Sequence, residues 1–321
     1  MSAKKRTRDE SESLFGPLGV VEPGEDRRHG GMKDFLPEQE PLKRLGSQNG
    51  VMVGTAAFAR AGEAGDLYPK GAKPGDYIRH YSRVFPTVEI DSTFYATPAA
   101  TTVRGWYEKT PRDFVFAAKV PRVITHDKVL VDCDEEFSQF VNSMEVLDEK
   151  LGPMLLQFGF FNRNIFRDGR EFLRRLEPFL KNLPAGHRFA VEIRNKGWLD
   201  ERFIDVLREN RVALALIDQS WVPRPWEMKD LGMDLVTTDF AYVRWLGDRK
   251  GIEEMTTTWD KTIVDRREDM LEWVKIFKDL VRRNLKVYAY ANNHYAGNGP
   301  GTVKLFWDLF EEDRNTGESV R

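Results

Sequence analysis

Residues 86–95, with the sequence PTVEIDSTFY, begin as a short apolar strand and end as a polar, aromatic turn. Thr87, Val88 and Ile90 favour a strand because β-branched side chains fit a pleated, buried surface. Glu89 lies inside this strand, and a second carboxylate follows two residues later. Since a buried ionised carboxylate is costly unless it is paired, the segment predicts that cations from elsewhere in the chain meet this strand end.

Seven more apolar runs of similar length surround this strand in the chain. They lie at residues 51–55, 114–119, 153–158, 188–193, 212–217, 240–245 and 286–291. Their near-continuous hydrophobicity is typical of parallel strands that are covered on both faces. Segments with helical spacing separate them, for example at residues 77–85, 137–144, 172–180, 270–281 and 303–310.

Eight strand–helix units in about 260 residues predict an α/β fold, a closed TIM (β/α)8 barrel. The alternative is an open doubly wound sheet. The barrel is favoured because no Gly-x-Gly-x-x-Gly follows the first strand and because polar residues end most of the strands. We therefore expect a single barrel domain over residues 51–312, with a flexible leader at 1–50 and a polar tail at 313–321.

The composition bounds the class of protein. The 321 residues carry a formal net charge of -2, with 31% charged and 41% apolar residues, which is the balance of a soluble globular chain. No run has the length of a membrane-spanning helix, and the single Cys133 cannot form an internal disulfide. We expect a cytoplasmic protein without a membrane partner. The net charge does not favour nucleic acid as a partner, although a local basic cleft stays open.

The polar residues at the strand ends define the candidate site, because active sites of such barrels lie at the carboxyl ends of the strands. They are Thr55, Glu89 with Asp91, Lys119, Gln157, Glu192 with Arg194, Asp218, Arg244, and Asn292 with Asn293. In strand 188–193 the period of two places Ala190, Glu192 and Arg194 on one face. A small residue below two charged ones indicates a face that points into the barrel.

Two interpretations of these strand ends stay open. In the first, Lys119, Arg194 and Arg244 bind a phosphate or carboxylate, and Glu89 and Glu192 act as a general acid/base pair. In the second, the same charges form a structural salt-bridge network at the top of the barrel.

Further residues join the candidate site from the connecting segments. His126 follows the third strand and is a candidate acid or base, or else a structural residue. The glycine-rich segment 297–301 precedes the last helix, where barrels often hold phosphate, although it also fits an ordinary loop. The predicted catalytic residues are Glu89, Lys119 and Glu192, and the predicted substrate-binding residues are Tyr95, His126, Gln157, Arg194, Trp198, Arg244, Asn292 and Asn293.

These motifs together resemble one known family. VEIDSTFY at 88–95, Thr125-His126, VEIR at 191–194 with Trp198, YVR at 242–244, and Asn292-Asn293 are similar to the signature of the YecE-like proteins, called domain of unknown function 72. The resemblance spans residues 51–312 and implies a TIM barrel without an assigned activity. Relatives often have Arg-His after the strand that corresponds to 188–193 and His-Gly after the one that corresponds to 240–245, where this chain has Arg194-Asn195 and Leu246-Gly247. Two potential imidazole ligands are therefore missing, which leaves a pocket of Glu, Lys and Arg.

Three functions fit these observations. The first is an enzyme (a hydrolase, lyase or isomerase) that acts on a small anionic substrate, with Lys119 as an electrostatic or Schiff-base lysine. The second is a metal-dependent phosphodiesterase or endonuclease-like barrel with Glu89, Glu192, Asp218 and His126 as ligands. The third is a non-catalytic module that binds a metabolite or partner. No metal-ligand motif such as H-E-x-x-H is present, and the sequence identifies no cofactor.

Overall fold

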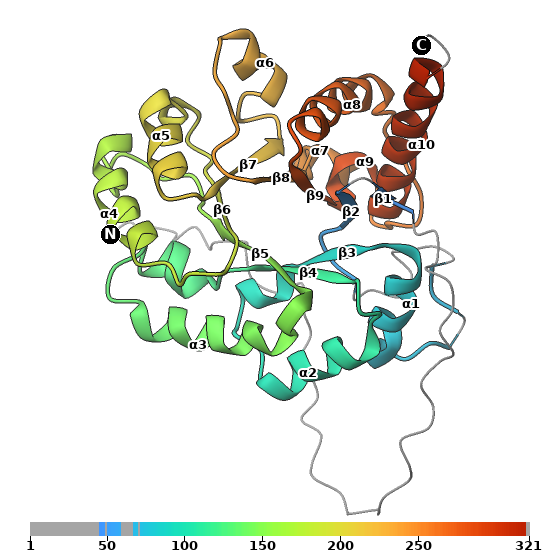
Figure 1. Cartoon of the computed structure of the whole chain (residues 1–321), viewed down its shortest axis with the longest axis horizontal. Helices are drawn as coiled ribbons and strands as arrows, with labels where there is room; N and C mark the ends of the chain where they lie inside the picture. The colour runs from blue at the N-terminus through green and yellow to red at the C-terminus, as the bar shows by residue number, and fades with distance from the viewer. Residues whose placement is uncertain (1–44, 49, 59–66, 70, 319–321) are drawn as a thin grey trace, which may run out of the picture. The chain divides into compact units, whose positions relative to one another are not determined.

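Eight parallel strands form a closed ring in the computed structural model of this protein, which describes residues 45–48, 50–58, 67–69 and 71–318 (Figure 1). Neighbouring strands pair in chain order, and the first strand of the ring pairs with the last over five residues. The strands of the ring are β2 (Val51–Thr55), β3 (Thr87–Ile90), β4 (Val115–Lys119), β5 (Leu151–Gln157), β6 (Phe189–Glu192), β7 (Ala213–Asp218), β8 (Phe240–Trp245) and β9 (Lys286–Ala291). The predicted TIM-like barrel is confirmed, and the open doubly wound sheet is excluded.

The helices lie outside the ring of strands (Figure 1). The main ones are α1 (Tyr77–Val84), α2 (Ala100–Lys109), α3 (Asp134–Met144), α4 (Gly169–Lys181), α5 (Glu201–Glu209), α6 (Pro225–Asp230), α8 (Arg267–Arg282) and α10 (Gly299–Glu318). Short helical turns sit mainly in the connections, namely η2 (Pro74–Asp76), η3 (Asp91–Phe94), η4 (Val123–Asp127), η5 (Glu145–Lys150), η6 (Lys196–Trp198), α7 (Arg249–Met255) and α9 (Asn293–Ala296). Several of these turns follow the carboxyl ends of the strands and therefore surround the candidate site.

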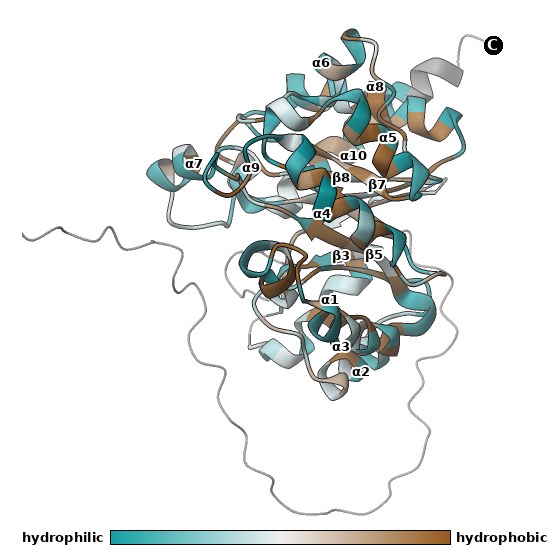
Figure 2. Ribbon diagram, turned by 90° about the vertical axis from the view of Figure 1, so that its left-hand side faces the viewer, coloured by the Kyte–Doolittle hydropathy of each residue, from teal (hydrophilic) through white to brown (hydrophobic). Residues whose placement is uncertain are grey.

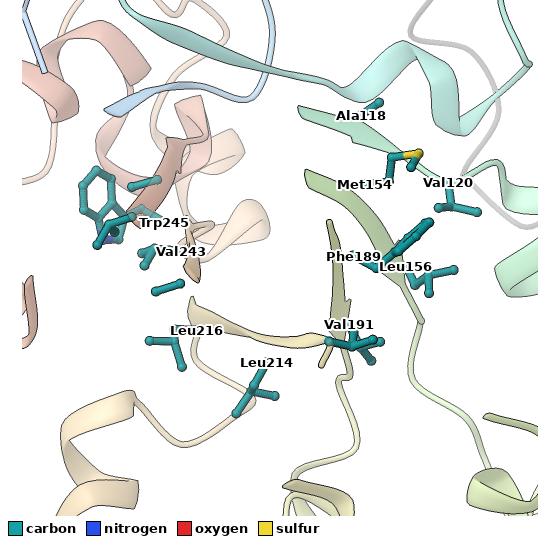
Figure 3. Packing of buried hydrophobic residues seen from close by; sticks show 14 of the residues in the cluster. Ala118, Val120, Met154, Leu156, Phe189, Val191, Leu214, Leu216, Val243 and Trp245 are labelled. Atoms are coloured by element: carbon teal, nitrogen blue, oxygen red, sulfur yellow. The ribbon is translucent and has the colours of Figure 1, made fainter. Parts of the chain in front are cut away.

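The alternation of side chains along the strands builds two apolar layers. The outward set packs under the helices and includes Met154, Leu156, Val191, Leu216 and Trp245 (Figure 3). In Figure 2 the strands are mainly brown, whereas the helices alternate teal and brown, as expected when one helix face covers the sheet. The two layers make the sheet apolar on both faces, as the uninterrupted hydrophobic runs predicted.

The inward set fills the barrel with side chains of unequal size. Alanines from β4, β6 and β7 lie in the same cluster as the large Tyr242, Tyr288 and Tyr290 from β8 and β9. Large side chains opposite small ones keep the interior close-packed. Ala190 belongs to this inward set, so the predicted orientation of the face that carries Glu192 is confirmed.

A hydroxyl group joins β2 to β3, which share only one register pair, Thr55 with Val88. The Tyr81 hydroxyl accepts a hydrogen bond from the Thr55 backbone N–H at 2.7 Å and donates to the Thr87 carbonyl at 3.0 Å. Gly54 permits this close approach, because a Cβ there would lie 1.9 Å from the Thr87 carbonyl oxygen. The polar strand end at Thr55 therefore serves the seam between β2 and β3.

Both ends of the barrel extend beyond the expected boundaries. β1 (Ser47–Gln48) pairs antiparallel with β2, inside the predicted leader, and α10 continues into the predicted polar tail. Residues 1–44, most of the predicted leader, lie outside the described residues. Among the helices described here, none is both long enough and apolar enough to cross a membrane.

Candidate functional site

Three buried charged side chains meet inside the carboxyl end of the barrel. Arg244 of β8 donates one hydrogen bond to Glu89 of β3 at 2.7 Å and another to Glu192 of β6 at 2.5 Å. The two carboxylates are completely buried, and the guanidinium is 3% exposed. We call Glu89, Arg244 and Glu192 the buried triad. The expectation that distant cations meet the Glu89 strand is confirmed by these contacts.

The electrostatics of the buried triad favour the charged forms of Glu192 and Arg244. Burial alone would raise the pKa of Glu192, but Arg244 and then Arg194 outweigh it and hold that pKa below its usual range. Burial would likewise lower the pKa of Arg244, but Glu89 and Glu192 raise it well above its ordinary value. Tyr242 donates to the second Glu89 oxygen at 2.6 Å. This geometry matches the salt-bridge network that the sequence left open, and acid/base roles for Glu89 and Glu192 stay a prediction.

A second charged layer lies at the mouth of the barrel, above the buried triad. Lys119, at the end of β4, pairs with Asp91 at 2.8 Å and lies 4.1 Å from the centre of the Phe94 ring. Thr93 donates to the Lys119 carbonyl at 2.7 Å, which holds η3 against the end of β4. Burial would raise the pKa of Asp91, but Lys119 and the nearby arginines lower it. Asp91 is therefore a carboxylate whose partner, Lys119, is largely buried.

His126 belongs to η4 and lies near Lys119, the last residue of β4. Its Nδ1 is 2.9 Å from the Thr125 hydroxyl, and its ring contacts Phe94 edge-on at 5.0 Å between centroids. Burial, followed by the charges of Lys119 and Arg194, lowers the pKa of His126 to about 4. Gly159, after β5, makes room for the imidazole, because a Cβ there would lie 3.2 Å from Nε2. His126 is therefore a neutral imidazole at pH 7 in a positive environment.

Arg194 joins the buried triad to the mouth. Its Nε donates to Glu192 at 3.1 Å, and 27% of its side chain is exposed. Its two terminal nitrogens form no hydrogen bond within the part of the chain that the structure describes. Buried Asn195 exchanges two hydrogen bonds with the backbone of Phe161, at 2.8 and 2.9 Å, and so fixes the next segment beside Arg194. The guanidinium is thus held at one edge and open at the other.

Other predicted site residues lie apart from this group or build its surroundings. Gln157 is buried inside the barrel and pairs in register with Glu192. Trp198 packs in an aromatic cluster with Phe161, Phe166 and Phe172, under the helices. Tyr95 follows η3 and is 59% exposed. Their substrate-binding roles remain predictions, and Tyr95 has the most accessible side chain of the three.

The glycine-rich segment after β9 uses its backbone N–H groups internally. Asn292 caps α9, and the Asn293 side chain accepts from the Gly299 N–H at 2.8 Å. Asn298 accepts from the Gly301 N–H at 2.6 Å. Since these donors are already satisfied, the structure favours the ordinary loop over the phosphate cradle that the sequence kept as an alternative.

The four ligands of the metal hypothesis do not come together. Asp218 points away from the barrel interior. On the outer side of the sheet its carboxylate accepts hydrogen bonds from Trp273 at 2.9 Å, Tyr295 at 2.8 Å and Arg224 at 3.2 Å. In the described ranges no group of three or more His, Cys, Asp or Glu side chains is arranged to hold a metal ion. The four residues therefore form no ready ligand set.

Two aromatic residues near the site were missed from the sequence. Phe94 contacts both Lys119 and His126, and Phe160, next to Gly159, is 66% exposed. The signal for Phe94 was its place in the TFY turn directly after the carboxylate strand. For Phe160 the signal was a phenylalanine in a strand-to-helix connection, the kind of segment that carries binding residues in this fold.

Comparison with known proteins places the chain among sequences of one family. The family model "Protein of unknown function DUF72" matches residues 52–320. The UPF0759 protein YecE of Escherichia coli is 33% identical over 129 residues, which are 40% of this chain and 45% of YecE, so the chain matches less than half of that relative. The UPF0759 protein YunF of Bacillus subtilis is 28% identical over 78% of this chain and 92% of YunF. A solved DUF72 family protein from Thermotoga maritima has a TM-score of 0.61 and 26% identity, over 82% of this chain and 98% of its own.

Proposed function

Because the chain belongs to the DUF72 family, whose description assigns no activity, we propose a function from the site itself: the barrel mouth binds a small anionic substrate. Arg194 and Lys119 hold a phosphate or carboxylate group, and His126 lies beside it. The buried triad beneath is the rigid floor that fixes Arg194 through Glu192.

The observation that carries this proposal is the state of Arg194. An arginine held through Nε keeps its two terminal nitrogens free for a planar, bidentate grip on an oxyanion. Lys119 adds a second cation at the same mouth, and its charge contributes to the lowered pKa of His126. A bound anion would satisfy donors that have no partner in the described residues.

Anion binding also prepares His126 for proton transfer. The charges of Lys119 and Arg194 are among the causes that hold its pKa at about 4. An anion between these cations would cancel part of that effect and move the pKa towards 6.5, where an imidazole is an effective acid or base at neutral pH. In this proposal Glu89 and Glu192 position the arginines, and His126 exchanges the proton with the substrate.

Calorimetric titration with inorganic phosphate, sulfate and small carboxylates tests the proposal. We expect saturable binding to the wild type at pH 7 and a loss of at least tenfold in affinity for Arg194→Gln. Arg167→Gln is the matched control, because Arg167 is a 79% exposed arginine on a neighbouring connection. If none of these anions binds, or if Arg194→Gln binds as tightly as the wild type, the proposal is wrong.

The non-catalytic module of the sequence interpretation predicts the same binding without conversion. Incubation with the tightest-binding anion, followed by NMR of the ligand, separates the two. Turnover that is lost in His126→Gln while binding persists supports the enzyme. Unchanged ligand after long incubation supports the binding module.

A further inference from the structure

Exposed apolar side chains gather at the carboxyl ends of the barrel strands. Of the eight large apolar side chains that are exposed in the described residues, six lie between the end of a strand and the next long helix. They are Tyr95, Val131, Phe160, Ile165, Trp221 and Met255. Single exposed apolar residues are ordinary, so the ones that bear on a ligand are those beside the cationic mouth.

Two of these residues flank the cationic mouth. Tyr95 contacts Phe94 edge-on at 5.3 Å, and Phe94 in turn contacts both Lys119 and His126. In the connection after β5, Phe160 follows Gly159, whose Cα carries no side chain where it faces His126 Nε2. We call Tyr95 and Phe160 the aromatic pair. Each ring belongs to the residue that directly follows one lying against His126, since Tyr95 follows Phe94 and Phe160 follows Gly159.

The backbone around Phe160 is held by buried hydrogen bonds. Asn195, the residue after Arg194, donates to the Phe161 carbonyl and accepts from the Phe161 N–H. Asn195 is 7% exposed, and the Phe161 ring is buried, so the chain is anchored directly after Phe160. Phe160 is therefore directed to solvent from a fixed position beside Arg194.

We propose that the anionic ligand of this site carries a planar ring and that Tyr95 and Phe160 pack against that ring. The inference rests on the proposed function, because it places the anionic group of the same molecule on Arg194 and Lys119. Aromatic side chains at a wet surface stack on planar rings at low entropic cost, since they have few rotatable bonds. An aryl or nucleoside phosphate has this chemistry, either as a free small molecule or as the end of a single nucleic-acid strand.

Calorimetry with inorganic phosphate, phenyl phosphate and a nucleoside monophosphate tests the pairing of ring and anion. Stacking on one aromatic side chain predicts that the aryl compounds bind about 5- to 150-fold more tightly than inorganic phosphate. In a Tyr95→Ala, Phe160→Ala double variant this advantage should shrink to less than about threefold, while the affinity for inorganic phosphate stays unchanged. Leu231→Ala is the control, because Leu231 is an exposed apolar residue that follows α6 and lies outside the six strand-to-helix positions.

The possible results separate this inference from the function beneath it. If inorganic phosphate binds through Arg194 but the aryl compounds gain nothing, or keep their gain in the double variant, the inference is overturned and the proposed function stands. If no phosphate compound binds the wild type, the inference is overturned, and the proposed function falls with it if sulfate and the small carboxylates do not bind either. A 5′-phosphorylated tetranucleotide that binds like the mononucleotide assigns the ring to a free small molecule. A tetranucleotide that binds at least tenfold more tightly, with the gain lost in the double variant, assigns it to a strand end.

Discussion

Replacing Arg244 by methionine tests how the barrel tolerates charge in its interior. The substitution keeps an unbranched side chain in place but leaves Glu89 and Glu192 without their shared cation, in a site where neither carboxylate is exposed. Removal of one partner of a buried ion pair costs about 3–5 kcal/mol. Tyr242 still donates to Glu89 and Arg194 still donates to Glu192, so we expect a loss within this range although two pairs are broken.

The pH dependence of this loss identifies its cause. In the wild type the lowered pKa of Glu192 contributes stability that is present above the unfolded-state pKa and is lost as the pH falls. Without Arg244, burial is the largest remaining influence, and we expect it to raise the pKa of Glu192 above the unfolded value. The folded variant then takes up the proton more readily, so the difference in stability between wild type and variant should narrow from pH 7 to pH 5.

Urea unfolding at both pH values measures the effect, with Arg283→Met as the control. Arg283 makes two hydrogen bonds to Asp234, at 2.8 and 3.0 Å, but both side chains are more than a third exposed, so its loss should cost about 1 kcal/mol or less. Adding Glu192→Gln to Arg244→Met should recover part of the stability, because a neutral amide is cheaper to bury. Equal losses for the two methionine variants, or a difference that does not change with pH, would refute the reasoning.

Three further outcomes follow from the structure. The lowered pKa of His126 contributes stability that is lost as the pH falls from about 6.5 to about 4, so the urea midpoint of His126→Gln should depend less on pH over that range than that of the wild type. NMR should find the wild-type imidazole titrating near pH 4. Gly105→Ala in α2, where a Cβ meets no atom within 4 Å, should add about 0.5–1 kcal/mol, whereas Gly54→Ala should destabilise the fold by several kcal/mol; a denaturant series that ranks them in reverse contradicts the packing described here. Asp218→Ala leaves three side-chain donors without their acceptor and should lower the free energy of unfolding by about 3 kcal/mol, while the affinity for phosphate stays as in the wild type. Weaker phosphate binding in that variant would place Asp218 in the site after all.

Much of the barrel was predictable because strands that are buried on both faces leave an uninterrupted apolar run. Strands β2, β8 and β9 begin and end at the predicted residues, and the other five differ by one or two residues at an end. The two charged layers at the mouth also follow from the sequence, since parallel strands bring their carboxyl ends to one edge. The short pairing of β1 had no such signal, because two residues do not make a pattern.

The orientation of a polar strand end was harder to predict than its position. Asp218 was counted with the pocket because it ends β7, but the alternation that turns Ala213 and Ala215 inward turns Asp218 outward. That signal was available in the sequence. The partners of Trp198 and Asn293 were not, since they come from packing and hydrogen bonds with residues outside the local pattern. Sequence patterns locate side chains along an element, and tertiary contacts decide what those side chains meet.

The buried triad also constrains when this chain can fold during its synthesis. Glu89 leaves the ribosome 155 residues before Arg244, an interval of about 8–30 s at ordinary translation rates. Through that time the early strands carry a carboxylate that they cannot bury without its cation. β2 likewise has an unpaired edge until β9 emerges. A half-made barrel that collapsed early would have to desolvate Glu89 without Arg244, so the buried triad opposes closure of the barrel before β8 has been made.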